Sequence, residues 1–248
     1  MKLSNHTILI TGGSSGIGLE LSRRLIEKKN KVIICGRSEE QLQAAQYQIP
    51  ELEIVKCDIS DENQCRHLRD WIGKKFPEVN MLINNAAIVH KTDFFNTDNI
   101  IEMAKKEVET NFMAPLRLIH DLFPYIQKNT NPAIINITTG LIYTPRADYP
   151  FYNATKAALH SFTQVLRKQT ESSNVQIIEV MFPAVKTPWH KGNPPKIAIS
   201  TEKAVQEMLE GLEKGKSEIR IAGANLLYKI SRIAPKFAFK KVNNLKNK

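Results

Sequence analysis

A tyrosine and a lysine stand four residues apart in the segment Tyr152-Asn153-Ala154-Thr155-Lys156. On a helix this spacing places both side chains on one face. A free tyrosine has a pKa of about 10, which is too high for ready proton exchange near neutral pH. A neighbouring ammonium lowers that pKa, so the pair could exchange a proton with a substrate oxygen. The alternative interpretation is a surface helical pair without chemistry.

Two hydroxyl side chains precede this pair at the end of a strand-like run. Thr139 lies thirteen residues before Tyr152, and Thr138 is its neighbour. A hydroxyl at this place could donate a hydrogen bond to a substrate oxygen on which negative charge develops. Thr139 and Thr138 are both candidates for this role. The alternative is that two β-branched residues complete a buried strand.

A glycine-rich turn follows the first apolar run of the chain. It reads Thr11-Gly12-Gly13-Ser14-Ser15-Gly16-Ile17-Gly18. Glycines allow a tight turn and let a phosphate approach the backbone without obstruction by a Cβ atom. A helix that begins here would offer free N–H groups and its positive end to a pyrophosphate. A turn without a ligand is the alternative. The residues predicted to bind a dinucleotide here are Gly12, Ser14, Ser15, Gly16, Ile17 and Gly18.

Strand-like and helix-like segments alternate along the chain. The short apolar runs are 7–11, 31–35, 52–57, 80–84, 133–138, 175–181 and 218–222, and a helix is expected near 201–214. This alternation predicts an α/β fold, a doubly wound parallel sheet of about seven strands with helices on both faces. Ligands of such sheets bind at the carboxyl ends of the strands, where the motifs above fall.

The composition is that of an ordinary globular protein. The 248 residues are 42% hydrophobic and 24% charged, which suffices for one large α/β domain. We find no apolar run of the roughly 18 residues that a membrane span requires and no signal peptide. The three cysteines have unrelated spacings, so we expect neither a disulfide framework nor a metal site, and a cytoplasmic location.

The net charge of +10 is concentrated near the C-terminus. Eight Lys and Arg residues and no carboxylate lie between Ile219 and Lys248, whereas the preceding part is nearly neutral. We therefore predict a catalytic domain at 1–222 and a basic, partly amphipathic tail at 223–248. Nucleic-acid binding is disfavoured, because proteins of that class usually spread their charge over a folded face.

The tail has a helical pattern that Pro235 is expected to divide into two short helices. One interpretation is a basic amphipathic element in peripheral contact with an anionic membrane. The other is that its apolar stripe packs on the body or on a second subunit. The apolar members are Leu226, Ile230, Ile233 and Phe237, and the basic ones are Lys229, Arg232, Lys236 and Lys240.

Over roughly residues 4–222 the chain resembles the short-chain dehydrogenase/reductase family in its single-domain form. The resemblance rests on the Thr-Gly-x-x-x-Gly-x-Gly turn together with Tyr152 and Lys156, and the segment 152–162 is similar to the bacterial DltE-type oxidoreductases. It implies a Rossmann-like fold, a nicotinamide dinucleotide that Tyr152 and Lys156 also contact, and a homo-oligomer, either a dimer or a tetramer. It also implies that Asn111 relays protons through water to Lys156. Thr139 stands where the family normally has Ser, so the resemblance implies that its hydroxyl bonds the substrate oxygen, with Thr138 as the second candidate.

The resemblance favours NADP over NAD as the cofactor. NAD-preferring relatives place Asp at the position of Gly36, and the next residue here is Arg37. A guanidinium would hold the 2′-phosphate of NADP, which a carboxylate would repel. The alternative is a solvated arginine at a strand end.

Further cofactor contacts are implied by shorter motifs. Asp58 and Ile59 match the adenine-binding positions, although Asp58 could instead belong to a helix N-terminus. Asn85 and Ala86 lie in Asn-Asn-Ala-Ala, in which Ala87 stands where the family usually has Gly.

Val185 and Thr187 match the contacts to the nicotinamide carboxamide and phosphate. They follow Phe182-Pro183, which stands where the family has Pro-Gly. These two contacts are therefore expected on a loop that departs from the family pattern.

Together these features predict an NADP-dependent oxidoreductase that interconverts a carbonyl compound and a secondary alcohol, with Asn111, Thr139, Tyr152 and Lys156 as its catalytic residues. The alternative is a dinucleotide-sensing or membrane-recruited binding protein with little turnover. A hydrophobic substrate is expected, because the candidate pocket residues are mostly apolar. They are Val89, His90, Leu141, Tyr143, Tyr149, Phe151, Phe182 and Trp189.

Overall fold

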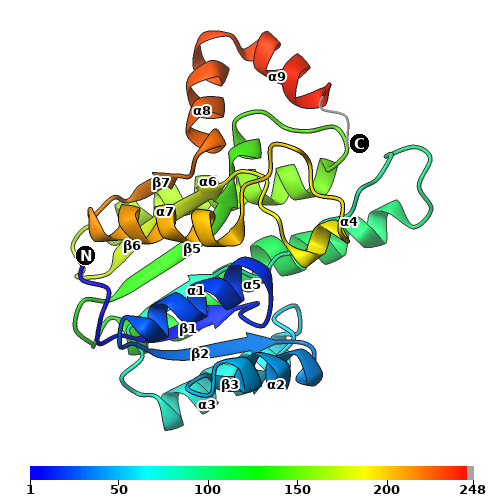
Figure 1. Cartoon of the computed structure of the whole chain (residues 1–248). Helices are drawn as coiled ribbons and strands as arrows, with labels where there is room; N and C mark the ends of the chain where they lie inside the picture. Colours follow the sequence, from blue (N-terminus) through cyan, green and yellow to red (C-terminus); the bar gives the residue numbers. More distant parts are fainter. Residues whose placement is uncertain (245–248) are drawn as a thin grey trace.

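Seven strands form a single sheet in the computed structural model, which describes residues 1–244 (Figure 1). Lys246 and Lys248 of the predicted tail lie outside these residues. Neighbouring strands are parallel and follow the order β3-β2-β1-β4-β5-β6-β7, which confirms the predicted Rossmann-like α/β fold. The strands are β1 (Thr7–Thr11), β2 (Lys31–Gly36), β3 (Glu53–Lys56), β4 (Met81–Asn84), β5 (Ala133–Thr139), β6 (Gln176–Phe182) and β7 (Glu218–Arg220).

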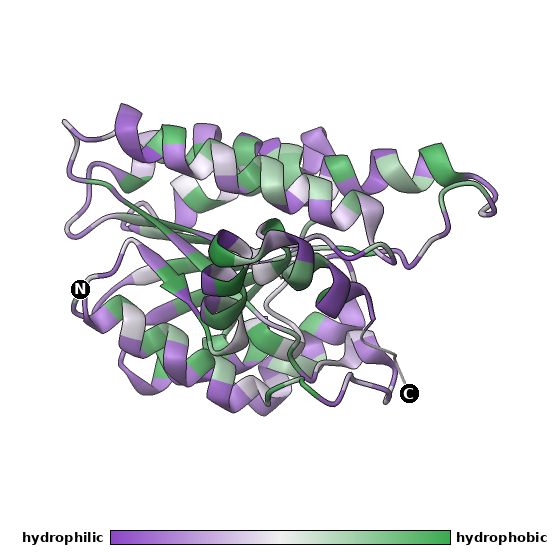
Figure 2. Ribbon diagram, turned by 90° about the horizontal axis from the view of Figure 1, so that it is seen from above, coloured by the Kyte–Doolittle hydropathy of each residue, from purple (hydrophilic) through white to green (hydrophobic). Residues whose placement is uncertain are grey.

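Helices cover both faces of the sheet. Alternate residues of a strand point to opposite faces, so Ile8 and Ile10 of β1 join one buried cluster and Leu9 joins the other. Figure 2 shows apolar and polar residues alternating along the outer helices, as expected for helices that cover a sheet. The α-helices that precede β7 are α1 (Gly16–Glu27), α2 (Glu39–Gln48), α3 (Glu62–Lys75), α4 (Ile100–Val108), α5 (Ala114–Ile126), α6 (Pro150–Gln169) and α7 (Thr201–Glu213).

The strand order reverses beside β1, which pairs with β2 on one side and with β4 on the other. Where the strand order reverses, the connections that follow two neighbouring strands run in opposite directions. A crevice then opens between them at the carboxyl edge of the sheet. The glycine-rich turn between β1 and α1 lies at this edge. The fold thus places the predicted dinucleotide-binding turn where such sheets bind ligands.

The segment between β6 and α7 is anchored at both ends. Val185 pairs with Ile199 in an isolated parallel bridge, and Ser200 caps α7 by accepting a hydrogen bond from the N–H of Lys203. A single 3-10 turn, η3 (Pro188–His190), lies within the segment. The segment is therefore a surface loop that is fixed to the sheet edge on either side.

The tail forms two helices, α8 (Gly223–Ile233) and α9 (Pro235–Asn243), which meet at Ala234 as the position of Pro235 predicts. Figure 1 shows them projecting from the body, with the end of α9 returning beside the loop before α6. The proposed domain boundary at residue 222 falls between β7 and α8. Within residues 1–244, no helix is long and apolar enough to span a membrane.

Candidate active site

A cavity of about 1150 Å³ lies at the carboxyl edge of the sheet. It gathers predicted residues from strand ends that are far apart in the sequence. Those that line it are Gly12, Ser14, Ser15, Gly16, Ile17, Gly18, Arg37, Asp58, Ile59, Asn85, Ala86, Thr139, Tyr152, Lys156, Val185 and Thr187. Asn111 is the exception among the predicted site residues and lies behind the cavity wall.

The glycine-rich turn has the geometry of a phosphate cradle. Gly16 adopts a left-handed backbone conformation with φ of +53°, and a Cβ atom on Gly18 would lie 2.2 Å from the carbonyl oxygen of Gly12. The Asn85 amide braces the turn, because its Nδ2 donates to the carbonyl oxygens of Thr11 at 2.9 Å and Gly12 at 3.1 Å. The turn therefore leaves the N-terminus of α1 open toward the cavity and fits a pyrophosphate.

Arg37 and Asp58, the two residues predicted to bind the adenosine part of a dinucleotide, both line the cavity. Arg37 is exposed and follows directly after β2. Asp58 accepts hydrogen bonds from the N–H and the hydroxyl of Ser60 at 3.0 and 2.7 Å. The residue that caps α3 is Asp61, and the N–H of Asp58 donates to Oε1 of Gln64 on that helix at 2.8 Å, so Asp58 lies just before the helix and does not cap it.

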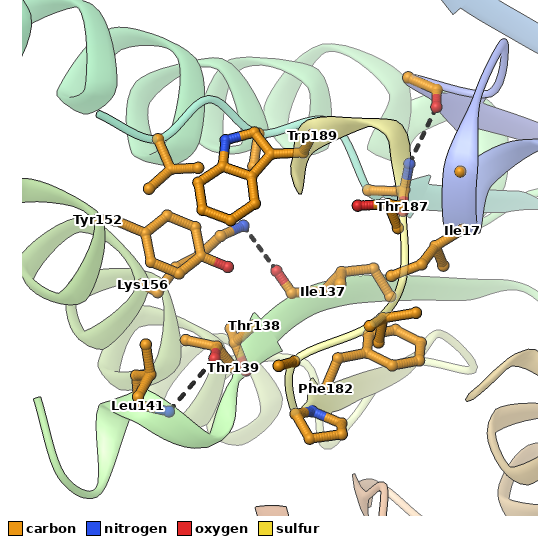
Figure 3. Close-up of a pocket in the computed structure, with 18 of the residues that line it drawn as sticks. Ile17, Ile137, Thr138, Thr139, Leu141, Tyr152, Lys156, Phe182, Thr187 and Trp189 are labelled. Carbon is orange, nitrogen blue, oxygen red and sulfur yellow. Dashed lines mark hydrogen bonds between the residues drawn. The ribbon is translucent and has the colours of Figure 1, made fainter. Parts of the chain in front are cut away.

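Tyr152 lies on the first turns of α6 and faces the cavity (Figure 3). Burial raises the pKa of Tyr152 to about 12, and a hydrogen bond with Thr139 opposes that rise. The negative charge of Glu107 adds to the rise, and Lys156, whose Nζ lies 6.0 Å from the ring centre, is not among the groups that shift this pKa. The pKa lowering that the sequence predicts from Lys156 is therefore not seen in this structure.

Lys156 is 2% exposed and lies one turn after Tyr152. Its Nζ donates a hydrogen bond of 2.8 Å to the carbonyl oxygen of Ile137 on β5 (Figure 3). Desolvation lowers the pKa of Lys156 to about 8, and the negative charge of Glu179 opposes that shift. The ammonium is therefore bound to a backbone carbonyl, and a nearby buried carboxylate favours its charged form.

The two candidate hydroxyls at the end of β5 have different partners. Thr138 donates to Oε1 of Glu179 at 2.5 Å, so its hydroxyl proton is engaged away from the cavity. Thr139 accepts from the N–H of Leu141 at 3.3 Å and also bonds to Tyr152. Of the two, Thr139 is the hydroxyl placed beside the tyrosine.

Glu179 was not anticipated from the sequence. It lies in the middle of β6, is fully buried, and accepts from Thr138 and from Nδ1 of His160 at 2.7 Å. Two sequence signals could have indicated it: a single carboxylate inside an apolar strand, and a histidine four residues after Lys156. A buried carboxylate requires such partners, since an unpaired one is strongly disfavoured.

Comparison with known proteins assigns the family. The model of the short chain dehydrogenase family matches residues 6–197. The chain belongs to the short-chain dehydrogenase/reductase family. It is 44% identical over 224 residues to the uncharacterized oxidoreductase DltE of Bacillus subtilis (strain 168), which covers 88% of this chain and 89% of DltE. The resemblance to the DltE-type oxidoreductases is thereby confirmed.

Solved structures of family members share the fold. A short chain dehydrogenase from Burkholderia cenocepacia J2315 in complex with NADP superposes with a TM-score of 0.86 at 23% identity, covering 98% of this chain and 99% of that one. A 3-ketoacyl-(acyl-carrier-protein) reductase from Brucella melitensis complexed with NADH gives a TM-score of 0.76 at 23% identity, covering 84% and 91%. The chain is thus an oxidoreductase with the fold of this family.

Asn111 occupies a π-helical turn, η1 (Glu109–Met113), between α4 and α5. It is fully buried, and its amide exchanges two hydrogen bonds of 2.8 Å with the backbone of Ile88. Nδ2 also donates to the hydroxyl of Thr155 at 3.3 Å. The side chain thus ties the loop after β4 to α6, and its predicted proton relay stays a prediction.

Five of the eight expected substrate-pocket residues line the cavity, namely Val89, Leu141, Tyr149, Phe182 and Trp189. The other three, His90, Tyr143 and Phe151, are not among the lining residues of the described chain, which corrects the expectation. His90 is bound to the buried carboxylate of Glu107 at 2.8 Å, and the hydroxyl of Tyr143 accepts from Nε of Arg220 at 2.9 Å.

Proposed function

We propose that this family member is an NADP-dependent oxidoreductase that interconverts a carbonyl compound and a secondary alcohol. The observation that supports it most directly is the meeting of Tyr152, Lys156 and Thr139 in the same cavity as the glycine-rich turn. A tyrosine and a hydroxyl beside a dinucleotide cradle provide both proton transfer and stabilisation of a substrate oxygen.

The residues at this cavity fit a nicotinamide dinucleotide. The glycine-rich turn would hold the pyrophosphate, Arg37 the 2′-phosphate and Asp58 the adenine, whereas Val185 and Thr187 would contact the nicotinamide end. When bound, the dinucleotide supplies a hydride to the carbonyl carbon or accepts one from the alcohol.

Tyr152 supplies the proton in the reductive direction. With its pKa raised to about 12, its hydroxyl is protonated near neutral pH and can donate to the carbonyl oxygen of the substrate. Thr139 donates a hydrogen bond to the same oxygen while negative charge develops on it. Lys156, together with the proposed relay through Asn111, replaces the proton that Tyr152 gives up. The reverse reaction uses the same groups in the opposite order.

Arg37 is the residue on which the preference for NADP depends. Replacing Arg37 with Ala removes a charge-assisted contact to the 2′-phosphate, so we expect NADPH to bind about tenfold more weakly or worse, with NADH binding little changed. Fluorescence titration of both proteins with NADPH and with NADH measures this. Equal affinities of the wild-type protein for the two dinucleotides would overturn the NADP preference and leave the oxidoreductase function standing.

Other parts of the account stay predictions. The homo-oligomer follows from the resemblance, the cytoplasmic location from the three cysteines, and the division at residue 222 from the charge pattern. Peripheral membrane contact through the tail competes with the interpretation that the tail packs on the body. The binding protein with little turnover differs from the enzyme in one observable, because it would bind NADPH without consuming it in the presence of any carbonyl compound.

A further inference from the structure

The two tail helices form part of the wall of the cavity that contains Tyr152. Leu226, Leu227 and Ile230 of α8, with Phe237 and Val242 of α9, line it. Leu226 and Phe237 remain 60% and 59% exposed. Apolar side chains that stay exposed inside a cavity favour a ligand that removes them from water.

The facing wall is also apolar. It is made by Leu141 after β5, by Tyr149 before α6, and by Trp189 and Ile197 of the loop before α7. The rings of Tyr149 and Trp189 pack edge to face with centroids 5.8 Å apart. Trp189 and Tyr152 line the same cavity (Figure 3), so this aromatic wall belongs to the cavity that contains the proposed catalytic tyrosine.

The charged side chains that line this end of the cavity are all positive. Outside the dinucleotide-binding turns, the ionisable lining residues within the described chain are Arg146, Tyr149, Tyr152, Lys156, His190 and Lys241, and none is a carboxylate. Arg146 is paired with Asp148 at 3.0 Å. A cationic ligand would therefore find no partner on this wall, whereas an uncharged chain can occupy it without desolvating a carboxylate.

The wall that α8 and α9 form is held in place at both ends. At its start α8 packs on the end of β5, since a Cβ atom on Gly140 would lie 3.0 Å from that of Ala224. At the end of α9, Asn243 accepts from the N–H of Ala147 at 2.7 Å and donates to the carbonyl oxygen of Pro145 at 3.1 Å. The wall is thus preformed on the protein, which limits the entropy cost of binding a flexible ligand.

We infer that the substrate is a carbonyl compound with a long, straight aliphatic chain, whose carbonyl group lies at Tyr152 and whose chain runs along α8 and α9. The inference rests on the proposed function and specifies its substrate class. The reaction adds a hydride to the carbonyl carbon and a proton from Tyr152 to the oxygen, so the chain itself is unchanged and serves only for binding.

The test compares straight-chain methyl ketones from propanone to decanone as substrates of the full chain with NADPH. We expect kcat/KM to rise about two- to fourfold for each added CH₂ group until the wall is covered. Replacing Ile230 with Ser should flatten that rise. The matched control is Ile233→Ser on the same helix, because Ile233 is 86% exposed and is not among the lining residues of the described chain. A rise that is absent in the wild type, or equal in both variants, would overturn the inference.

A second measurement separates this inference from the proposed function. Straight-chain alcohols from butanol to decanol, added with NADPH, should raise the Tm of the wild-type protein increasingly with chain length, and less in Ile230→Ser. If no ketone is reduced but this trend holds, the proposed function fails and the aliphatic site stands. If ketones are reduced without any dependence on chain length and the trend is absent, the aliphatic site fails and the proposed function stands.

Discussion

The buried charges behind Tyr152 set the chemistry at the scale of single residues. Lys156 has its pKa lowered to about 8 by desolvation, and Glu179 is the negative charge that limits this shift. Glu179 is in turn held by Thr138 and His160. The proton on Lys156 therefore depends on a carboxylate in a neighbouring strand that is itself buried.

Replacing Glu179 with Gln keeps the size of the side chain and removes its charge. The pKa of Lys156 should then fall below about 8, because desolvation would act unopposed. Since a lowered pKa means that the ammonium loses its proton at lower pH, we expect the alkaline decline of kcat/KM to move to lower pH. Steady-state rates measured between neutral and alkaline pH would show it.

The matched control is Glu171→Gln, which removes an exposed carboxylate that pairs with Lys168. This variant should keep the wild-type profile, because an exposed pair is screened by solvent. If the pH profile of Glu179→Gln coincided with those of the wild type and of Glu171→Gln, the charge of Glu179 would have no effect on the pKa of Lys156.

The sequence predicted the reacting residues better than their electrostatics. Spacing placed Tyr152 and Lys156 on one helix face, since helix periodicity determines where these side chains point, and the resemblance to the family added Thr139. It did not predict the sign of the shift in the Tyr152 pKa, which depends on how much protein surrounds the hydroxyl. It also missed Glu179, whose partners come from β5 and α6.

At the scale of elements, the turn between β1 and α1 requires glycine for a steric reason. A Cβ atom on Gly18 would lie 2.2 Å from the carbonyl oxygen of Gly12. We expect Gly18→Ala to lower stability by about 1–3 kcal/mol and to weaken NADPH binding, because α1 must shift away from the turn. Urea unfolding and fluorescence titration measure the two effects.

Gly223→Ala serves as the control for that substitution, since a Cβ atom there would meet only Pro183 at an ordinary 3.8 Å. It should leave the stability and the affinity for NADPH close to the wild-type values. If Gly18→Ala behaved in the same way, the steric argument for the turn would be wrong.

The side chain of Asn243 bonds the end of α9 to the loop before α6. Replacing Asn243 with Ala removes its hydrogen bonds to Ala147 and Pro145, each of which contributes about 0.5–1.5 kcal/mol. We expect amide hydrogen exchange in 235–243 to accelerate while the core strands keep their protection. The exposed Asn225 of α8, changed to Ala, is the control, and equal exchange in the two variants would show that Asn243 does not fix the helix.

At the scale of the whole molecule, the alternation of strands and helices predicted the sheet, because each apolar run needs cover on both faces. The position of the tail relative to the cavity was harder to predict. Its helices and their break at Pro235 were predictable from local pattern, but the contact of Ile230 and Phe237 with the cavity depends on how α8 leaves β7. No local pattern specifies that angle. The sequence therefore did not decide whether the tail contacts a membrane or packs on the body or on a second subunit.

The most direct test of the central claim follows deuterium from NADPH, labelled at its reactive ring carbon, into the alcohol formed from a methyl ketone. We predict one deuterium at the carbinol carbon with the wild-type protein. With Tyr152→Phe the rate should fall by about 10²–10⁴-fold while the affinity for NADPH is retained. A wild-type protein that binds NADPH but forms no labelled alcohol would contradict the account and favour the binding protein with little turnover.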